Sequence, residues 1–581
     1  NTDDNIVTAY NLKNYKKNMQ LDNNIINNWI NGSSNGYKIK QEKFREILNN
    51  PFIYDVSDDI REKFLNEDAF GDRSKIVVGL QTGNNDKYLK YKWEIKKELL
   101  GKEYIPYAKG GGYSKYANDI ITYIHWDNKS VNYYKNSSKA RKNYLTSYLT
   151  DGDRELFLKE AITYSDVTSN NMFSARYMPK SCVFDVSGSC IFSNKIDYNY
   201  LLGFINSKLV NYILMILNPT PHFQVGDMIR IPYVEPDNEV RKKIVDKTKN
   251  IIQKKEWLLG FNYISDFYHQ VEIEYGLTQT NGSILEAYKS YLKKYEEVML
   301  DIYKLEFEID NLIYDLYEIT DRDIEVIEER FNKSAYRYPS LDNKAEILTK
   351  KEFEQLYCIG DPMLDGRQQQ PMNIIEIAEY KQINPKDVLD LRIKYNIYRD
   401  RDLKETVLKW LRAIVKDEVI SRDPKLYLDE DIERIIRTYI QNRFEKGYQI
   451  LEELEAILEK PLIEIIRVGT KLGSSNTPLA GDGPGDTNEP LLQQKKLYGR
   501  GKHKIVVLWH LQQFLLEFDK EKKYVMQNEI RRITELLQQR LNSCKEKLQR
   551  EGLLKKEITD LEREEKILKE SIVSLNQWQV V

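Results

Sequence analysis

The sequence lacks the features that mark a metalloprotein, a secreted protein or a membrane protein. Its four cysteines contain no C-x-x-C pair, and its five histidines do not fall at metal-ligand spacing beside them. No apolar run approaches the ~20 residues that a membrane-spanning helix needs, and no signal peptide opens the chain. We therefore expect a cytoplasmic protein in a reducing compartment, with neither a structural zinc nor a membrane partner.

A net charge of one sign is also absent. The 88 Lys and Arg residues nearly cancel the 90 Asp and Glu residues, so any surface that binds a polyanion has to be local. Such a surplus exists between Gly71 and Glu160, where 17 basic residues stand against 11 acidic ones. A length of 581 residues with 41% hydrophobic content is enough for roughly three or four domains with real cores.

Periodicity predicts an α+β chain in which a mixed module precedes a mostly helical region. Short β-branched and aromatic runs (KIVVGL, DIITYIHW, SCVFDVSGSCIFS) predict strands around one amphipathic helix at 200–217, and helical periodicity dominates beyond residue 238. Breaks rich in Pro and Gly are expected at 361–373 and 473–490. The expected regions are a connecting helical region at 1–70, the α+β module at 71–236, helical regions at 237–357 and 358–472, a flexible linker at 473–494, and an antiparallel coiled-coil hairpin at 495–581.

The most suggestive stretch is YIPYAKGGGYSKYAND at 104–119. Three consecutive glycines, Gly110, Gly111 and Gly112, allow a backbone to approach a phosphate closely, while Lys109 and Lys115 supply positive charge and the interleaved tyrosines can stack on a base. A flexible glycine loop with solvated lysines explains the same residues. The stretch has no G-K-[ST] and no G-x-G-x-x-G, so nucleotide hydrolysis is not indicated.

Other polar residues of the module have the side chains that read base edges in duplex DNA. The turn LQTGNNDK carries Thr82, Asn84, Asn85 and Lys87 between two expected strands, and further along the chain lie Arg176 and Gln224. Each of them alone is equally typical of an ordinary surface loop. Cys182 and Cys190 are most simply core thiols.

Four blocks in order resemble one protein family. They are KIVVGLQTGNNDKYLKYKWEI, then YIPYAKGGGYSKYAND with YIHWDN, then ITYSDVTSNNMFSARYMPKSCVFDVSGSCIF, and then YLLGFINSKLVNYILMILNPTPHFQVGDMIRIPYV. In order and spacing over residues 70–234 they resemble the target-recognition half of the PglX adenine methyltransferases of bacteriophage-exclusion (BREX) systems, which are related to type IIG restriction-methylation enzymes. The helical remainder is similar to that family's tail.

The resemblance implies transfer of a methyl group from S-adenosylmethionine to adenine N6 in a specific duplex DNA site, with other phage-defence proteins as partners. The family's catalytic Asn/Asp-Pro-Pro-aromatic motif, which holds a flipped adenine, is not found; the nearest text is NPTP at 218–221. No glycine-rich cofactor motif is found either. We therefore expect S-adenosylmethionine to be bound by an N-terminal domain outside this chain, which begins at Asn1 rather than Met.

Two alternatives stay open at this stage. The chain could be a stand-alone DNA-specificity subunit that acts in trans with a separate methyltransferase. It could also be a structural coiled-coil protein in which the basic loop has no ligand. The family assignment and the stand-alone specificity subunit imply the same DNA-contacting residues. Backbone phosphate would be contacted by Lys109, Lys115 and the three glycines. The residues on or near the DNA would be Thr82, Asn84, Asn85, Lys87, Arg176 and Gln224.

Overall fold

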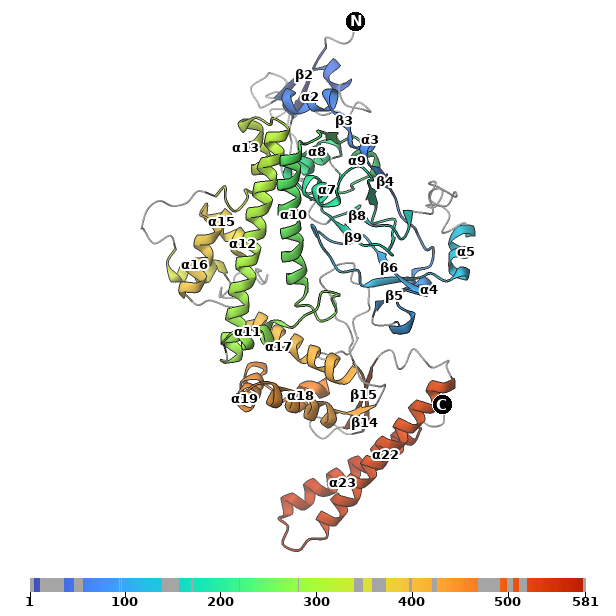
Figure 1. Cartoon of the computed structure of the whole chain (residues 1–581). Helices are drawn as coiled ribbons and strands as arrows, with labels where there is room; N and C mark the ends of the chain where they lie inside the picture. The colour runs from blue at the N-terminus through green and yellow to red at the C-terminus, as the bar shows by residue number, and fades with distance from the viewer. Residues whose placement is uncertain are drawn as a thin grey trace, which may run out of the picture.

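The computed structural model shows an α+β protein with several small sheets and a mostly helical second half (Figure 1). It describes residues 5–10, 36–45, 56–92, 95, 97–137, 156–168, 172–218, 220–280, 282–338, 348–357, 372–395, 400–420, 426–468, 492–498, 505–510 and 520–577. The predicted linker lies outside these residues up to position 491, and the predicted break at 361–373 lies outside them up to position 371.

Two four-stranded sheets form the centre of the predicted α+β module. One has the order β10-β6-β7-β5 and the other β4-β11-β8-β9, and every pairing is antiparallel except β6 with β10. The strands are β4 (Lys75–Val77), β5 (Leu89–Tyr91), β6 (Tyr104–Ala108), β7 (Thr122–His125), β8 (Ala161–Tyr164), β9 (Ala175–Met178), β10 (Val183–Phe184) and β11 (Cys190–Phe192). The β-branched and aromatic runs of the sequence therefore do form strands, as predicted.

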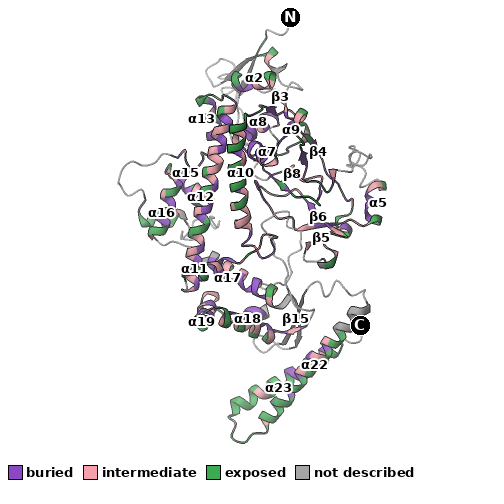
Figure 2. Ribbon diagram, viewed as in Figure 1, coloured by how far each residue is buried: buried purple, intermediate pink, exposed green. Residues whose placement is uncertain are grey.

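The single amphipathic helix predicted at 200–217 is wrong. The segment forms two helices, α7 (Tyr198–Ile205) and α8 (Lys208–Leu217), with a bend of 62° between them. Ser207 caps α8 by accepting a hydrogen bond from the Val210 N–H. Both helices are buried nearly all round (Figure 2), because the sheets cover one side and longer helices cover the other. In the described part of the chain no single helix is long and apolar enough to cross a membrane.

Long helices cover the side of α7 and α8 that faces away from the sheets (Figure 1). These are α10 (Asn238–Leu259) and the 33-residue α12 (Ile284–Leu316), and α13 (Asp321–Arg330) follows. One hydrophobic core runs from Ile162 and Ile191 in the sheet through Phe204 to Ile244 and Ile309 on the long helices. The sheets and the first helical region thus share a core, so the boundary predicted at 236/237 does not separate two hydrophobic cores.

The remaining helices form three further clusters (Figure 1). Their bounds are α11 (Glu272–Thr280), α14 (Lys350–Tyr357), α15 (Ile374–Lys381), α16 (Pro385–Tyr395), α17 (Asp400–Val415), a π-helical turn (Lys416–Ile420), α18 (Asp429–Arg443), α19 (Gly447–Leu458), α20 (Leu462–Val468), α22 (Lys520–Leu548) and α23 (Lys555–Asn576). The last two pack against each other through Ile533 and Leu537 of α22 and Leu568 of α23.

Strands appear in regions where the sequence predicts helix or linker. β14 (Leu492–Tyr498) and β15 (Ile505–His510) precede α22 and form a sheet with β13 (Tyr427–Leu428). In the region 1–70, β1 (Ile6–Tyr10) pairs with β2 (Gly36–Lys40) next to a 3-10 turn (Gln41–Arg45) and α2 (Asp58–Asn66). β3 (Asp68–Ala69) pairs with β12 (Pro232–Tyr233), an edge strand as expected from its proline.

Largely covered ion pairs join the two-sheet module to the helices behind it. Lys115 pairs with Glu306 of α12 at 3.2 Å, and Lys208 at the start of α8 pairs with Glu328 of α13 at 2.6 Å. Asp310 of α12 accepts a hydrogen bond from the Lys208 N–H at 2.9 Å. Because burial disfavours its charge more than the two lysines favour it, the pKa of Asp310 is raised to about 6.

We expect Asp310→Asn to remove a pH dependence from the folding equilibrium. The folded protein holds the proton of Asp310 more tightly than the unfolded chain does, so this group stabilises the fold at low pH. That stability is lost as the pH rises from about 4 through about 6. Thermal melts of both proteins between pH 4 and 8 check this. As the pH rises, the free energy of unfolding of the variant should increase relative to that of the native chain, by up to about 3 kcal/mol. A constant difference across this range would contradict the assignment.

Candidate nucleic-acid interface

Several strand ends of the two sheets meet at one edge of the molecule. The register of β11 places Cys190 opposite Val77 and Thr163, so β4 and β8 end where β11 begins. In the other sheet, Ala108 at the end of β6 lies opposite Phe184 at the end of β10. The connecting segments 78–88, 109–116, 165–168 and 185–189 therefore emerge at the same side, and we call them, together with residues 220–224, the loop edge.

Backbone hydrogen bonds join four segments of the loop edge, and the glycine loop is joined to them through the Ser165 hydroxyl, which bonds Gly111 and Gly112. Leu80 bonds Phe184 and Val186, the Asp166 N–H donates to the Ser187 carbonyl at 3.0 Å, and the Phe223 N–H donates to the Asp166 carbonyl at 2.7 Å. The segments thus lie side by side although more than 130 residues separate the first from the last. Of the residues predicted to lie near DNA, this arrangement brings together the turn at 82–87, the glycine loop, Arg176 and Gln224.

The turn at 82–87 is organised from within. Thr82 is fully buried; its Oγ1 donates to Asn85 Oδ1 at 2.6 Å and accepts from the Asn84 N–H at 3.2 Å. Asn84 caps the short helix α4 (Asn85–Tyr88) by accepting from the Lys87 N–H. Asn84, Asn85 and Lys87 are exposed. Thr82 therefore braces the turn, and the other three side chains lie at the surface.

The three glycines of the loop have three different environments. A Cβ at Gly110 would lie 1.7 Å from the Ser187 carbonyl oxygen, so this glycine allows two loops to pack. Gly112 has a φ of +57°, a conformation that side chains disfavour. Gly111 differs from Gly110, because a Cβ there would meet no atom within 4 Å. Gly111 therefore faces open space.

The two lysines that flank the glycines differ just as clearly. Lys109 is exposed. The ammonium of Lys115 is largely covered and paired with Glu306. Burial is the largest single effect and opposes the charge of Lys115. Glu306, with smaller contributions from Tyr113, Tyr116 and Asp310, outweighs it, so the pKa of Lys115 is raised well above its usual value. Lys115 thus anchors the loop to α12, whereas the phosphate contact predicted for it requires a free ammonium.

Arg176 lies below the glycine loop rather than on the surface. Arg176 is only 4% exposed. Its Nη1 donates to Ser165 Oγ at 3.1 Å, and its Nη2 donates to the Lys109 carbonyl at 3.4 Å. Burial lowers its pKa to about 10. Direct reading of a base edge needs an exposed guanidinium, so the structure gives Arg176 a different place from the predicted one.

The segment that carries Gln224 closes the loop edge on its far side. Gln224 is exposed and precedes the helix α9 (Val225–Ile229). The neighbouring His222 lies 3.4 Å from Asp166, a contact that no sequence pattern indicates because 56 residues separate the two. In the NPTP stretch, Asn218 bonds Thr220 and Asp227, while Pro219 lies outside the described residues.

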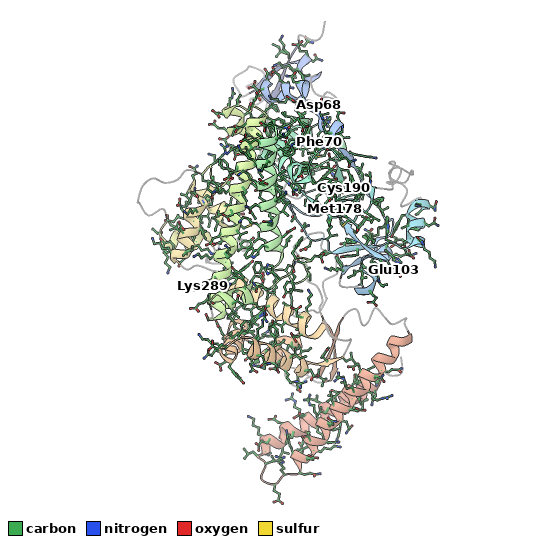
Figure 3. The ribbon with its side chains drawn as sticks, viewed as in Figure 1. Asp68, Phe70, Glu103, Met178, Cys190 and Lys289 are labelled. Carbon is green, nitrogen blue, oxygen red and sulfur yellow. The ribbon has the colours of Figure 1, made fainter. Side chains whose placement is uncertain are left out.

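Among the described residues, the cysteines are buried and no candidate metal site is found. Cys182, Cys190 and Cys544 are free and buried, and burial raises the pKa of Cys182 to about 12, which suits the core role predicted for it. Cys190 packs beside Met178, with the two sulfur atoms 3.7 Å apart (Figure 3). Cys358 lies outside the described residues. No cluster of three His, Cys, Asp or Glu suitable for a metal is found among those described.

The glycine loop also does not fit S-adenosylmethionine. A glycine-rich cofactor loop joins a strand to a helix whose N-terminus faces the ligand. Here the glycines follow β6, but the next element along the chain is the strand β7, and the following helix α5 (Asn128–Asn136) begins 16 residues after Gly112. We derive no step of methyl transfer from these residues.

Known proteins similar to this chain are methyltransferases. It is 27% identical over 358 residues to the adenine-specific methyltransferase BrxX of Escherichia coli O9:H4 (strain HS). The aligned region covers 58% of this chain and 28% of BrxX. It is 26% identical over 303 residues to the adenine-specific methyltransferase PglX of Lacticaseibacillus casei (strain Zhang), covering 49% and 24%. No protein-family model matches.

Among solved structures, the type IIL restriction-modification enzyme MmeI in complex with DNA is similar with a TM-score of 0.29 and 11% identity, over 44% of this chain and 34% of that one. This chain spans about a quarter of the length of the curated relatives it matches. The resemblance that the four sequence blocks indicate is confirmed: over about half of its length, this chain is a homologue of the BrxX and PglX adenine-specific methyltransferases.

Proposed function

We propose that this chain is the DNA-recognition and scaffold part of a site-specific DNA adenine-N6 methyltransferase of a phage-defence system. In this proposal the loop edge binds duplex DNA, and the helices behind the sheets hold it in place and contact other defence proteins. The methyl donor, S-adenosylmethionine, and the catalytic Asn/Asp-Pro-Pro-aromatic residues belong to a domain outside these 581 residues.

One observation carries the proposal: the polar segments that resemble the family's recognition blocks lie side by side at one edge of two sheets. Exposed amides of Asn85 and Gln224 have the donor and acceptor groups that read base edges, and exposed Lys87 and Lys109 can contact phosphates. Asn85 uses its Oδ1 to accept from Thr82, and no partner for its Nδ2 group is found among the described residues. That amide is thus available as a donor.

The alternative is a specificity subunit that acts in trans on a separate methyltransferase. The loop edge would do the same work in that case, so the two proposals differ only in covalent connection. An upstream reading frame that encodes an N-P-P-aromatic motif in the same polypeptide would contradict the alternative. The other rival, a purely structural protein, makes no use of the loop edge and is tested by DNA binding.

We expect the double change Lys87→Ala and Lys109→Ala to weaken binding of the full 581-residue chain to every duplex alike. Each lysine that contacts a phosphate releases a counterion, so the slope of log affinity against log salt should fall in magnitude by about 0.9 for each phosphate that a lysine no longer neutralises. Fluorescence anisotropy with a labelled duplex across a salt series measures both quantities.

The charge-matched control is Lys545→Ala with Lys547→Ala, two lysines on α22, far from the loop edge in the fold (Figure 1). This control should bind DNA with the native slope. Equal slopes for the two double variants would place Lys87 and Lys109 off the DNA. If the native chain bound no duplex and showed no salt dependence, the structural rival would replace the proposal.

A further inference from the structure

Among the described residues, no carboxylate pairs with the buried charge of Arg176. Its partners there are the Ser165 hydroxyl and the Lys109 carbonyl. These two bonds use two of the five N–H groups that a guanidinium offers. A buried charge without a counterion costs several kcal/mol, so proteins rarely keep one unless something else compensates it.

The position of Arg176 indicates where a compensating anion would lie. Its two partners connect it to the glycine loop: Ser165 Oγ also accepts from the Gly111 N–H at 3.2 Å and donates to the Gly112 carbonyl at 3.3 Å. The loop therefore rests directly on the guanidinium. Above it, Gly111 leaves open space where any other residue would place a side chain, and Lys109 is exposed beside it.

We propose that Arg176, Gly111 and Lys109 form a seat for one phosphate group, which on DNA is a backbone phosphodiester. Gly111 lets the phosphate approach the loop, Lys109 contacts it from the solvent side, and Arg176 supplies positive charge from beneath the loop. Lys115 is not part of this seat, because Glu306 already neutralises it. That the phosphate comes from DNA rests on the proposed function. That the seat binds a phosphate group does not.

Gly111→Ala is the sharpest test, because the added methyl group points into open space and leaves the fold unchanged. We expect its Tm to equal that of the native chain and its affinity for duplex DNA to fall about tenfold, or about 1.4 kcal/mol, because the methyl group occupies the seat. Gly110→Ala is the contrasting variant: its methyl group would collide with the Ser187 carbonyl, so it should lower the Tm. Native affinity of Gly111→Ala for DNA would overturn the seat as a DNA contact.

Arg176→Gln tests the charge with inorganic phosphate as the probe. Titrating phosphate at constant ionic strength should raise the Tm of the native chain and leave that of Arg176→Gln unchanged, since binding to the folded state alone stabilises it. Equal responses of the two proteins would overturn the seat. On DNA, Arg176→Gln should also reduce the salt slope by about 0.9.

The two proposals fail in different ways. If the native chain binds duplex DNA but Gly111→Ala and Arg176→Gln bind it with native affinity and slope, the seat is wrong and the proposed function stands. If the native chain binds no duplex while phosphate still raises its Tm through Arg176, the phosphate seat stands and the DNA-binding function falls.

Discussion

Replacing Lys208 by Met is expected to lower the free energy of unfolding by about 3 kcal/mol, because it leaves a buried carboxylate with one partner fewer. Lys208 Nζ donates to Glu328 Oε2 at 2.6 Å and to the Asn332 carbonyl at 3.0 Å, and the Glu328 side chain is only 3% exposed. Arg337, 3.4 Å from Glu328, still faces the carboxylate in the variant, so the loss should lie at the lower end of the range for broken buried pairs. Chemical denaturation measures it.

The chain contains a matched control for this prediction. Lys243 and Glu239 of α10 also form an ion pair at 2.6 Å, but their side chains are 51% and 75% exposed. Water screens such a pair, so Lys243→Met should leave the Tm almost unchanged. The double variant Lys208→Met with Glu328→Leu should recover part of the stability that the single change loses, since it also removes the buried Glu328 carboxylate that the single change leaves without its lysine. Equal Tm values for Lys208→Met and Lys243→Met would contradict the buried-pair account.

A consequence for function follows from the position of this ion pair. Lys208 begins α8, which packs in the same core as the sheets, and Glu328 belongs to a helix of the region behind them. Weakening the pair loosens the module from its scaffold without touching the loop edge. In the proposed function, Lys208→Met at a temperature where it stays folded therefore keeps the native salt slope for DNA.

The sequence predicts local structure here better than it predicts contacts between distant segments. The strands β4 and β7 come from runs of β-branched and aromatic residues, and the turn at 82–87 comes from Asn and Gly, so short-range chemistry determines both. In contrast, nothing in the stretch KGGGYSK distinguishes Lys109 from Lys115. The difference arises from Glu306, which lies 191 residues further along the chain.

Arg176 shows the same limit for a candidate site residue. Its residue type is suited to reading a guanine edge, and the sequence around it gives no sign of burial depth. Its environment is set by Ser165 and by the carbonyl of Lys109, 11 and 67 residues away. The sequence could identify the segments that meet at the loop edge, because they resemble known blocks, but not which side chains in them face solvent.

The pattern at 200–217 predicts one amphipathic helix because Asn206, Lys208 and Asn211 interrupt an apolar run. Polar residues in such a run usually mark a solvent face. In the fold they instead serve the interior: Asn206 and Asn211 bond the backbone of the strand region at Ala175 and Phe173, and Lys208 forms its buried pair. Buried amides with backbone partners have no period in the sequence, so hydropathy alone misplaces them.

Asn206→Ala is the second change for which we expect a large effect, a loss of about 2–3 kcal/mol. Asn206 is 1% exposed; its Oδ1 accepts from the Ala175 N–H at 2.8 Å and its Nδ2 donates to the Ala175 carbonyl at 2.9 Å. Removing the amide leaves a buried N–H without a partner, which costs about 1–3 kcal/mol, and adds a small cavity. The carbonyl keeps its bond from the Tyr116 N–H.

Asn206→Asp separates the two halves of this interaction. The carboxylate can still accept from the Ala175 N–H but cannot donate to the carbonyl, and its charge would be buried, so the loss should exceed that of Asn206→Ala at neutral pH and shrink as the pH falls. Asn250→Ala, at an exposed site on α10, is the control and should change little, since Ala favours helix. Because Ala175 directly precedes Arg176, phosphate should raise the Tm of both Asn206 variants less than it raises that of the native chain. A native-sized rise from a lowered starting Tm would show that Asn206 holds the strand but does not support the phosphate seat.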